Sequence, residues 1–227
     1  MSCLEKAEWE KLIDGLVKQG ILYSPAIIKA MRNVPRYKFL PVDAQFYHAR
    51  DTPLSIGSGQ TISAPQMVSI MNEALKLQVG QKILEVGAGS GWHAATIAEI
   101  IAPKDAPRSK WGHIYTVEII KSLAEFARKN IIKAGYGDKV TIINADGSKG
   151  YSEKAPYDRI VVAAAAPSVP QPLIDQLNVG GVMVIPVGES ALLQMLIRVT
   201  KEENGTVKQE RLGEVVFVPL TGEYGVH

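Results

Sequence analysis

The sequence contains few of the residues that form disulfides, metal sites or nucleic-acid surfaces. Cys3 is the one cysteine among 227 residues, which excludes an internal disulfide and a cysteine-based metal site and is typical of a reducing compartment. The four histidines include no pair at the spacing of helical metal ligands, so we expect no metal. The net charge is only +2 and no basic run reaches five residues, so we expect neither nucleic acid nor an anionic membrane as a partner.

Long apolar runs are also missing, and none could cross a membrane. The segment 1–6 is charged early and lacks the apolar core of a secretory signal, so we expect a cytoplasmic protein. The composition, 46% hydrophobic and 21% charged, is that of an ordinary globular protein. The length is sufficient for one domain with a well-buried core.

The N-terminal third contains helical patterns. Apolar residues recur at helical spacing over 4–18. Ser24 as N-cap and Pro25 in the first helical position begin a second helix, which ends before Pro35. Residues 67–75 are helical again, so this part of the chain is mainly α-helical.

Strands and helices then alternate. The segment 160–163 is continuously apolar, as expected for a strand covered on both faces. This βαβ series predicts an α/β fold with a doubly wound, mostly parallel sheet. The expected strands are 82–86, 114–118, 139–143, 158–163 and 181–186, and the expected helices are 92–101, 121–134 and 170–177.

The sheet is expected to end in an antiparallel pair. Residues 191–199 and 207–218 have strand patterns, and Asn204-Gly205 between them is a two-residue hairpin signal. The segment 103–112 is expected to be a surface insertion.

The most informative feature is a glycine-rich turn between strand 82–86 and helix 92–101. Gly87, Gly89 and Gly91 would let a ligand approach bare backbone at the positive end of a helix. Their spacing differs from the dinucleotide fingerprint, and no Gly-Lys-Ser/Thr follows, which excludes a P-loop. Glu85 before the turn is unfavourable for pyrophosphate but suits a cation. S-adenosylmethionine carries a sulfonium and an ammonium, so we expect this cofactor.

Acidic residues also end the next two strands, at the edge where ligands bind in doubly wound folds. Glu118 could accept hydrogen bonds from ribose hydroxyls, or it could support the start of helix 121–134. Asp146 could accept from an adenine amine while Gly147 lets the ring lie against the backbone, although Asp-Gly is also simply a turn. The position after successive strands favours ligand contacts.

Residues 35–63 are rich in Pro, Gly and Ser and are expected to be irregular, and so long a loop in a compact domain is usually functional. Ser63 precedes helix 67–75, and from its position alone the N-cap interpretation is favoured. Its hydroxyl and the free N–H groups of a helix start could also hold a substrate carboxylate. A covalent role is not expected, because Ser63 has no Gly-x-Ser-x-Gly elbow and no assignable partner histidine.

Together these residues resemble the protein L-isoaspartate O-methyltransferases. The resemblance runs from about residue 34 to residue 221, and the segment 59–65 is specific to that family, whereas the glycine turn is shared with class I methyltransferases generally. It is carried by Val34-Pro35-Arg36, by 53–68, by Glu85 to Trp92, by Ala163 to Pro167, by Pro186-Val187-Gly188 and by Val218-Pro219-Leu220-Thr221.

The resemblance implies a class I methyltransferase-like fold and methyl transfer from S-adenosylmethionine to the free α-carboxylate of L-isoaspartyl residues in damaged proteins and peptides, which begins their repair. By position, it implies that Ser63 is the active-site serine. The implied cofactor contacts are Glu85, Gly87, Gly89, Gly91, Glu118, Asp146 and Gly147. The implied substrate contacts are Gln60, Thr61, Ile62 and Thr221.

The resulting prediction is one domain over 1–227. Residues 1–76 form N-terminal helices and a substrate loop, 77–188 a cofactor-binding core, and 189–227 a C-terminal hairpin. The alternative is a class I methyltransferase acting on a small molecule or RNA, and the near-neutral charge argues against RNA. A nicotinamide dehydrogenase or a non-catalytic binding module is less consistent with the glycine spacing and the acids after successive strands. The sequence does not predict the oligomeric state.

Overall fold

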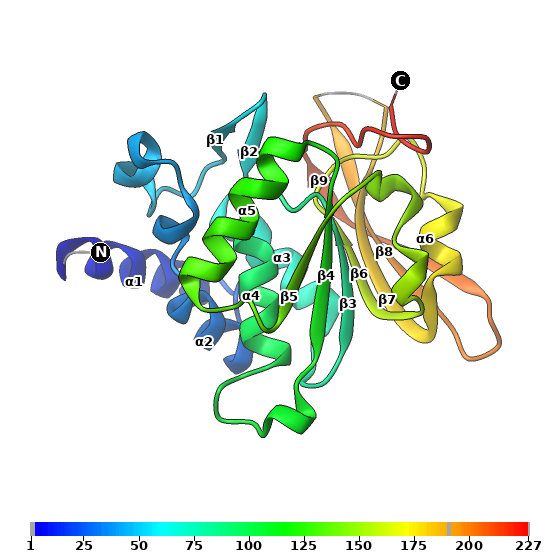
Figure 1. The fold of residues 1–227 in the computed structure, drawn as a ribbon, viewed down its shortest axis with the longest axis horizontal. Helices are drawn as coiled ribbons and strands as arrows, with labels where there is room; N and C mark the ends of the chain where they lie inside the picture. The colour runs from blue at the N-terminus through cyan, green and yellow to red at the C-terminus, as the bar shows by residue number, and fades with distance from the viewer. Residues whose placement is uncertain (1–2, 190–191, 227) are drawn as a thin grey trace.

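The computed structural model of the chain describes residues 3–189 and 192–226. Its centre is a seven-stranded sheet in the order β5-β4-β3-β6-β7-β8-β9, which confirms the predicted α/β fold (Figure 1). The first five strands of this order pair in parallel, and the last two pairings are antiparallel, as expected. The strands are β3 (Lys82–Val86), β4 (His113–Glu118), β5 (Val140–Asn144), β6 (Tyr157–Val162), β7 (Leu177–Val187), β8 (Gln194–Lys201) and β9 (Val207–Val215).

Six α-helices of the described residues surround the sheet. They match the expected segments to within a few residues, and they are α1 (Cys3–Lys18), α2 (Pro25–Asn33), α3 (Pro65–Leu75), α4 (Trp92–Ile101), α5 (Lys121–Ala134) and α6 (Gln171–Asp175). Short 3-10 helices lie in the loops between elements: η1 (Arg36–Phe39), η2 (Val42–Tyr47), η3 (Arg108–Lys110), η4 (Gly147–Lys149) and η5 (Ser152–Lys154).

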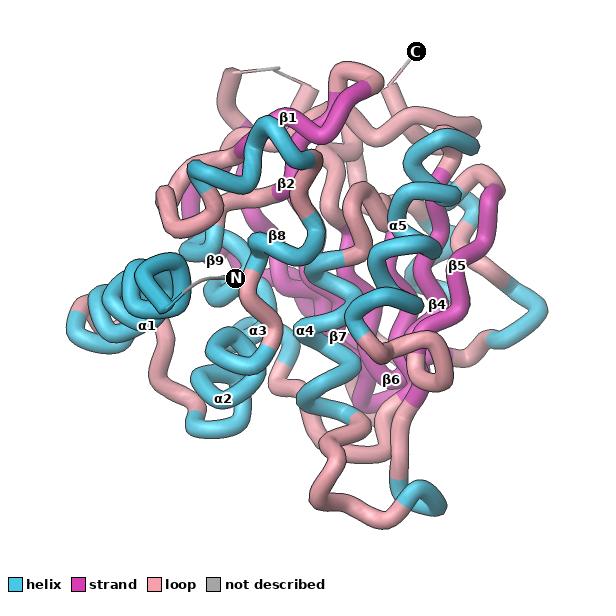
Figure 2. The backbone as a smooth tube through the Cα atoms, turned by 60° about the vertical axis from the view of Figure 1, so that its left-hand side comes forward, coloured by secondary structure: helices cyan, strands magenta, loops and turns pink. Residues whose placement is uncertain are grey.

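Side chains alternate between the two faces of the sheet and build two hydrophobic clusters. Ile83 and Ile114 point to the face covered by α1 to α5, whereas Leu84 and Val117 point to the face that includes α6. Figure 2 shows α3, α4 and α5 lying along the sheet, with α1 and α2 outside them. Both faces are therefore buried, which accounts for the continuously apolar strands.

The order in which the chain adds strands to the sheet reverses between β3 and β6. The chain runs from β3 outward to β4 and β5, then returns to β6 on the other side of β3. Such a point leaves a crevice at the carboxyl ends of the two central strands, where doubly wound folds bind ligands.

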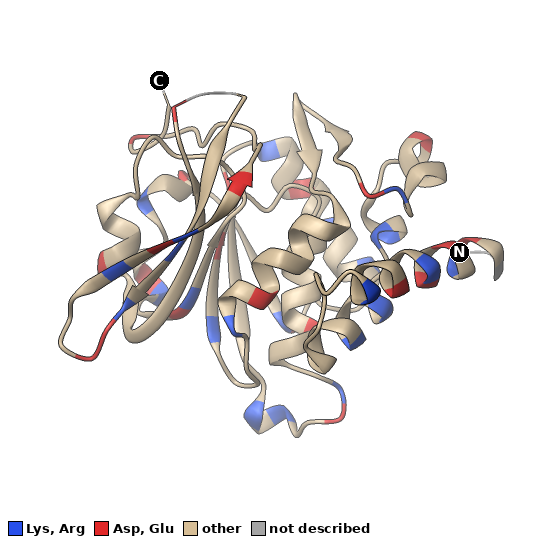
Figure 3. Cartoon of the chain, turned by 180° about the vertical axis from the view of Figure 1, so that it is seen from behind, with Lys and Arg blue, Asp and Glu red and all other residues tan. Residues whose placement is uncertain are grey.

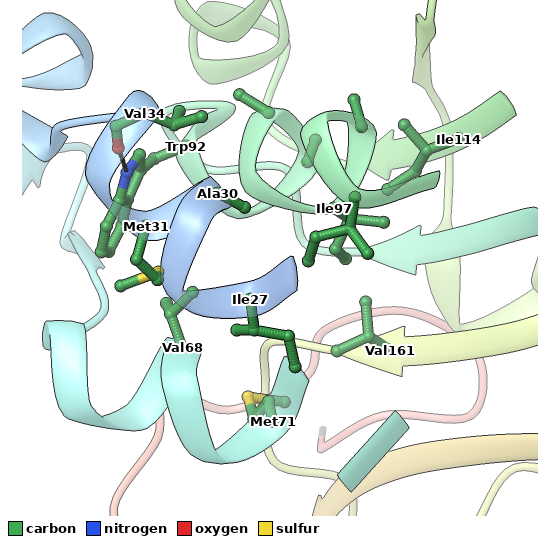
Figure 4. Packing of buried hydrophobic residues seen from close by; sticks show 14 of the residues in the cluster. Ile27, Ala30, Met31, Val34, Val68, Met71, Trp92, Ile97, Ile114 and Val161 are labelled. Atoms are coloured by element: carbon green, nitrogen blue, oxygen red, sulfur yellow. Dashed lines mark hydrogen bonds between the residues drawn. The ribbon is translucent and has the colours of Figure 1, made fainter. Parts of the chain in front are cut away.

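Helices α2, α3 and α4 pack together on the sheet (Figure 4). The indole of Trp92, at the start of α4, is buried among them and donates to the carbonyl of Val34 (2.8 Å). Ser24 is the N-cap residue of α2, as predicted, but its side chain does not cap the helix; its hydroxyl donates to Glu73 of α3 (2.5 Å). These contacts fasten the N-terminal helices to the parallel core.

Two local predictions need correction. The segment 35–63 is more regular than expected, because it contains η1, η2 and an antiparallel hairpin of β1 (Leu54–Gly57) and β2 (Gln60–Ile62). Strands β8 and β9 are joined by a five-residue loop, 202–206, rather than by a two-residue turn, since Lys201 pairs with Val207. The predicted start of the first of these strands, residue 191, lies outside the described residues.

Charged side chains of both signs lie on this fold. Acidic and basic side chains are interspersed on the elements seen from behind (Figure 3). No described helix is long and apolar enough to span a bilayer. No group of three or more metal-ligating side chains that could hold an ion is found among the described residues.

Candidate active site

A cleft of about 800 Å³, including the part open to solvent, lies at the reversal point of the sheet. Two of its sides carry the predicted residues. The glycine wall consists of 86–90 and 117–120, and the Ser63 wall consists of 60–63 and 218–221. The remaining lining residues are Val68, Trp92, His93, Ala163 and Ala164. The cleft therefore brings together Ser63, Gly87, Gly89, Glu118, Gln60, Thr61, Ile62 and Thr221, as predicted.

The glycine wall has the backbone geometry that its sequence predicts. Gly87, Gly89 and Gly91 have φ values of +93°, +52° and +84°, a backbone region that residues other than glycine rarely adopt. Gly91 is the N-cap residue of α4 and does not itself line the cleft. A Cβ there would lie 3.1 Å from Ile131 Cγ1, so its role is close packing of the turn against α5.

Glu118 stands beside this turn at the end of β4. One carboxylate oxygen accepts from the N–H of Gly89 (2.9 Å), and the other accepts from the N–H of Ile120 (3.0 Å), the residue before α5. The carboxylate therefore supports the helix start, as one interpretation predicted, and it also lines the cleft; a contact with ribose stays a prediction. A carboxylate has about four acceptor sites, which leaves capacity for ribose hydroxyls.

Glu85 lies behind the cleft rather than in it. Its side chain is fully buried on the α4 face of the sheet, where it accepts from the hydroxyl of Thr116 (2.5 Å). Burial raises the pKa of this carboxyl to about 8; the Thr116 hydrogen bond opposes the shift, and the charge of Glu118 adds to it. Direct contact between Glu85 and the cofactor remains a prediction, and this geometry gives it no support.

His93 is a cleft residue that the sequence reasoning missed. It is the second residue of α4, it lines the cleft, and its Nε2 lies 3.0 Å from Asn72 Oδ1 of α3. Burial lowers the pKa of its imidazole to about 4, so the ring is neutral at physiological pH. The available signal was position, because the first turn of the helix after a glycine-rich loop faces the ligand site.

Asp146 and Gly147 also lie outside the cleft lining. The Asp146 carboxylate accepts from the N–H and hydroxyl of Ser148 and from the N–H of Glu223 (2.9 Å). The C-terminal segment thus covers this carboxylate, and a Cβ on Gly222 would collide with it. An adenine contact by Asp146 stays a prediction.

The guanidinium of one buried arginine fixes the backbone of the Ser63 wall. Arg36 is fully buried and donates to five backbone carbonyls, including that of Ser63 (3.1 Å). The other four are those of Tyr47, His48, Arg50 and Thr52. Buried carbonyls need donors, and five from one rigid fork fix the loop that leads into the cleft. Burial lowers the pKa of Arg36 to about 10, which still leaves it charged at physiological pH.

Ser63 is not the N-cap of α3, which corrects the favoured interpretation. The N-cap residue is Ala64, without a side-chain cap, and Pro65 holds the first helical position. The carboxylate of Asp51 caps the helix instead, accepting from the N–H of Gln66 (2.8 Å). Within the described residues the Ser63 hydroxyl has no hydrogen-bond partner, so it is not committed to a structural bond.

The residues present fit S-adenosylmethionine. The positive-φ turn leaves bare backbone where a Cβ would narrow the crevice: a Cβ on Gly87 would meet Ala163, and one on Gly89 would meet Ile56, each at ordinary contact distance. The fully buried Oε1 of Glu85, which has no hydrogen-bond partner in the described chain, lies behind the turn, and the Glu118 carboxylate lies beside the turn in the cleft lining. These carboxyl oxygens suit a cationic ligand better than a pyrophosphate.

Comparison with known proteins decides the family. A family profile described as Protein-L-isoaspartate(D-aspartate) O-methyltransferase (PCMT) matches residues 7–225. The chain belongs to the protein-L-isoaspartate(D-aspartate) O-methyltransferase family. A relative from Hyperthermus butylicus, named Protein-L-isoaspartate O-methyltransferase, is 54% identical over 215 residues, covering 95% of this chain and 89% of the relative. One of the same name from Thermococcus sibiricus is 49% identical, covering 96% and 95%.

Solved structures of this family have the same fold. A Plasmodium falciparum beta-aspartate methyltransferase (PCMT) in complex with S-adenosyl-L-homocysteine superposes with a TM-score of 0.82 at 28% identity, covering 94% of this chain and 98% of that one. A second structure, named protein-L-isoaspartate O-methyltransferase, gives the same TM-score and identity and covers 95% and 67%. The resemblance inferred from the sequence motifs is thereby confirmed, and so is the class I methyltransferase fold.

Proposed function

We propose that the glycine wall binds S-adenosylmethionine, that the Ser63 wall binds an L-isoaspartyl residue, and that the cleft between them is where the methyl group is transferred. The enzyme is a protein-L-isoaspartate O-methyltransferase that uses S-adenosylmethionine as methyl donor. The observation that carries the site assignment is that the two walls, far apart in the sequence, line one cleft.

On the glycine wall, backbone and carboxylate groups position the donor. Bound S-adenosylmethionine supplies a methyl group on an electrophilic sulfonium. Glu118 offers its remaining acceptor sites to a ribose, since Gly89 and Ile120 occupy one site on each oxygen. Trp92 and His93 close the cleft from the α4 side.

On the Ser63 wall, the chain orients a carboxylate. The Ser63 hydroxyl is available as a donor, because neither the N-cap position nor a described side chain uses it. Arg36 fixes the backbone carbonyl of Ser63 and so holds the side chain in position. Thr221 lies on the same wall and places a second hydroxyl there.

This reaction needs no protein base. An α-carboxyl has an ordinary pKa of about 3.5, so the attacking oxygen is already ionised at neutral pH. His93 is neutral and is hydrogen-bonded to Asn72, and it is not required to remove a proton from the substrate. The contribution of the chain is orientation and exclusion of water.

Methyl transfer to synthetic peptides tests this function. A peptide with one L-isoaspartyl residue should accept methyl groups from labelled S-adenosylmethionine, and the matched peptide with normal L-aspartate should not. Equal methylation of both peptides would show that the enzyme methylates carboxyl groups without a preference for isoaspartate. Methylation of neither would favour a small-molecule or RNA substrate, the alternative activity.

We propose the cellular setting from the composition. The single cysteine and the modest net charge support a cytoplasmic enzyme whose partners are damaged proteins and peptides rather than nucleic acids or membranes. Fractionation of the native host and a nucleic-acid binding assay at physiological salt would check this.

A further inference from the structure

A chain of buried polar side chains connects α3 and α4 to the back of the glycine wall. Thr96 donates to the carbonyl of His93 (2.8 Å), so its oxygen accepts from the amide nitrogen of Asn72 (3.4 Å). The amide oxygen of Asn72 therefore faces His93 Nε2 (3.0 Å), and Nε2 carries the proton. It follows that Nδ1 presents its lone pair on the other side of the ring.

That lone pair faces Glu85. His93 Nδ1 lies 3.7 Å from Glu85 Oε1, a fully buried oxygen without a hydrogen-bond partner among the described residues. A lone pair opposite an ionised carboxylate is repulsive, whereas a protonated carboxyl directs its proton toward Nδ1. The geometry therefore favours a neutral Glu85 when no cation is near.

The other groups around Glu85 support this state. Thr116 donates to the second oxygen, and Glu118, at the end of the same strand β4, adds repulsion toward an ionised Glu85. The neighbour on β6 is Val161, which is apolar and buried. Among the described residues, His93 and Glu118 are the titratable groups that face Glu85. Burial raises the pKa of Glu85 to about 8, in agreement with this arrangement.

His93 lines the cleft, and Glu85 lies behind His93. A charged group in the cleft can therefore act electrostatically on the carboxyl without contacting it. An opposite charge a few ångströms away favours the ionised form of a buried carboxyl. S-adenosylmethionine carries a sulfonium, and S-adenosylhomocysteine carries a neutral thioether in its place. The two molecules share every other group.

We propose that Glu85, placed behind His93, makes the enzyme discriminate between the methyl donor and its demethylated product. Glu85 is ionised when the sulfonium is bound and protonated when the thioether is bound. The proton that leaves the carboxyl on donor binding passes to solvent water and returns after transfer. This inference rests on the proposed function and adds to it a residue that favours donor over product.

Calorimetric titration of the wild-type enzyme with both ligands tests the proposal directly. The ratio of affinities, donor over product, should rise about tenfold between about pH 6.5 and about pH 8.5, because the ionised carboxyl becomes more populated. The sulfonium also lowers the pKa of the donor's own ammonium relative to that of the product, and the same titrations with Glu85→Gln measure this ligand contribution so that it can be subtracted. Repeating the experiment in buffers of different ionisation enthalpy should show more proton release for the donor than for the product.

Three variants assign the effect to this carboxyl. Glu85→Gln should keep product affinity within about threefold but lose the preference for the donor and the part of the pH dependence that this carboxyl causes. Thr116→Val retains the acid but removes its hydrogen-bond donor, so the rise in preference should move to higher pH; it also tests the proposal if Glu85→Gln does not fold. Glu99→Gln is the matched control, since Glu99 is a buried acid of α4, the helix of His93, and is bonded to Asn33 and Tyr136; its affinity ratio should not change.

A Glu85→Gln enzyme with the wild-type ratio and pH dependence would overturn the proposal, as would an unshifted profile in Thr116→Val. Wild-type enzyme that binds both ligands with a pH-independent ratio would overturn it while leaving the proposed function intact. Wild-type enzyme that binds neither ligand would contradict the proposed function itself.

Discussion

The two walls of the cleft are built from interactions of very different range. The glycine wall comes mainly from one strand–turn–helix unit, 82–101, with Glu118 added by the next strand. The Ser63 wall depends on Arg36, which lies 27 positions away, and on Asp51, which caps α3 from 15 positions away. A wall formed locally should tolerate changes elsewhere, whereas a wall held by distant side chains should fail when one of them is lost.

Replacing Arg36 should therefore have the largest effect. In Arg36→Lys, one ammonium cannot reach five carbonyls, so several buried acceptors lose their donor. We expect a stability loss of about 3–5 kcal/mol, the range for breaking a buried charged network. In the enzyme that remains folded, kcat/KM for an isoaspartyl peptide should fall by more than about a hundredfold. Denaturant unfolding and steady-state kinetics measure the two quantities.

An Arg36→Lys enzyme that loses cofactor affinity as strongly as peptide turnover would contradict the distinction between the two walls. Arg32→Lys is the control, because Arg32 is an exposed arginine that forms ion pairs with Glu10 and Asp14 on the surface. Such pairs contribute little, and its stability should change by less than about 1 kcal/mol.

Glu118 should have the next largest effect, and on the opposite wall. Glu118→Ala should weaken S-adenosylhomocysteine binding by about 1–3 kcal/mol, since a charged acceptor beside the glycine turn is lost. The KM for the peptide, measured at saturating cofactor, should stay within about threefold. Unchanged cofactor affinity in a folded variant would leave Glu118 with only its contact at the start of α5.

Ser63 and Asp51 form a matched pair with smaller and separable effects. Ser63→Ala should lower kcat about tenfold while the melting temperature stays constant, because the hydroxyl caps nothing. Asp51→Ala should lower stability by about 1 kcal/mol, because it removes the cap of α3. A loss of stability in Ser63→Ala with full activity would return that serine to a structural role.

The smallest expected effect is the pH dependence of stability that is caused by Glu85, which is buried behind the glycine wall. Glu85 has a pKa raised to about 8 in the folded enzyme, so between about pH 6.5 and pH 8 the folded state keeps a proton that the unfolded state has lost. Stability should therefore fall as pH rises through this window, by about 1 kcal/mol. At lower pH, the lowered pKa of His93 acts in the opposite direction.

Urea unfolding of the ligand-free enzyme at several pH values measures this slope. The Glu85→Gln variant should not show it. A wild-type enzyme whose stability is level or rising over this window would indicate an ionised Glu85.

These contrasts explain what the sequence predicted and what it did not. The succession of strands and helices along the chain, the glycine turn and the position of Glu118 follow from periodicity and spacing over a few residues. The N-cap assignment of Ser63 was wrong because a carboxylate from another segment takes that role, and no local pattern reveals a cap supplied from Asp51. His93 resembled an ordinary helical residue, and only the packing of α3 against α4 shows its bonds to Asn72.

The same limit applies to the acidic residues near the carboxyl ends of β3 and β5. Glu85 and Asp146 were predicted as cofactor contacts from their positions, yet burial in one case and the C-terminal segment in the other keep both out of the cleft lining. Position after a strand predicts proximity to the site, but the neighbouring side chains decide whether an atom reaches it.

A double-mutant cycle between the two walls tests the central claim most directly. The free-energy changes in kcat/KM for Arg36→Lys, Glu118→Gln and the combined variant would be measured with an isoaspartyl peptide at subsaturating cofactor. If the walls are built independently, the two losses should add, with a coupling energy below about 0.5 kcal/mol. A coupling of about 2 kcal/mol or more would contradict this account, because it would show that the two walls form one cooperative unit.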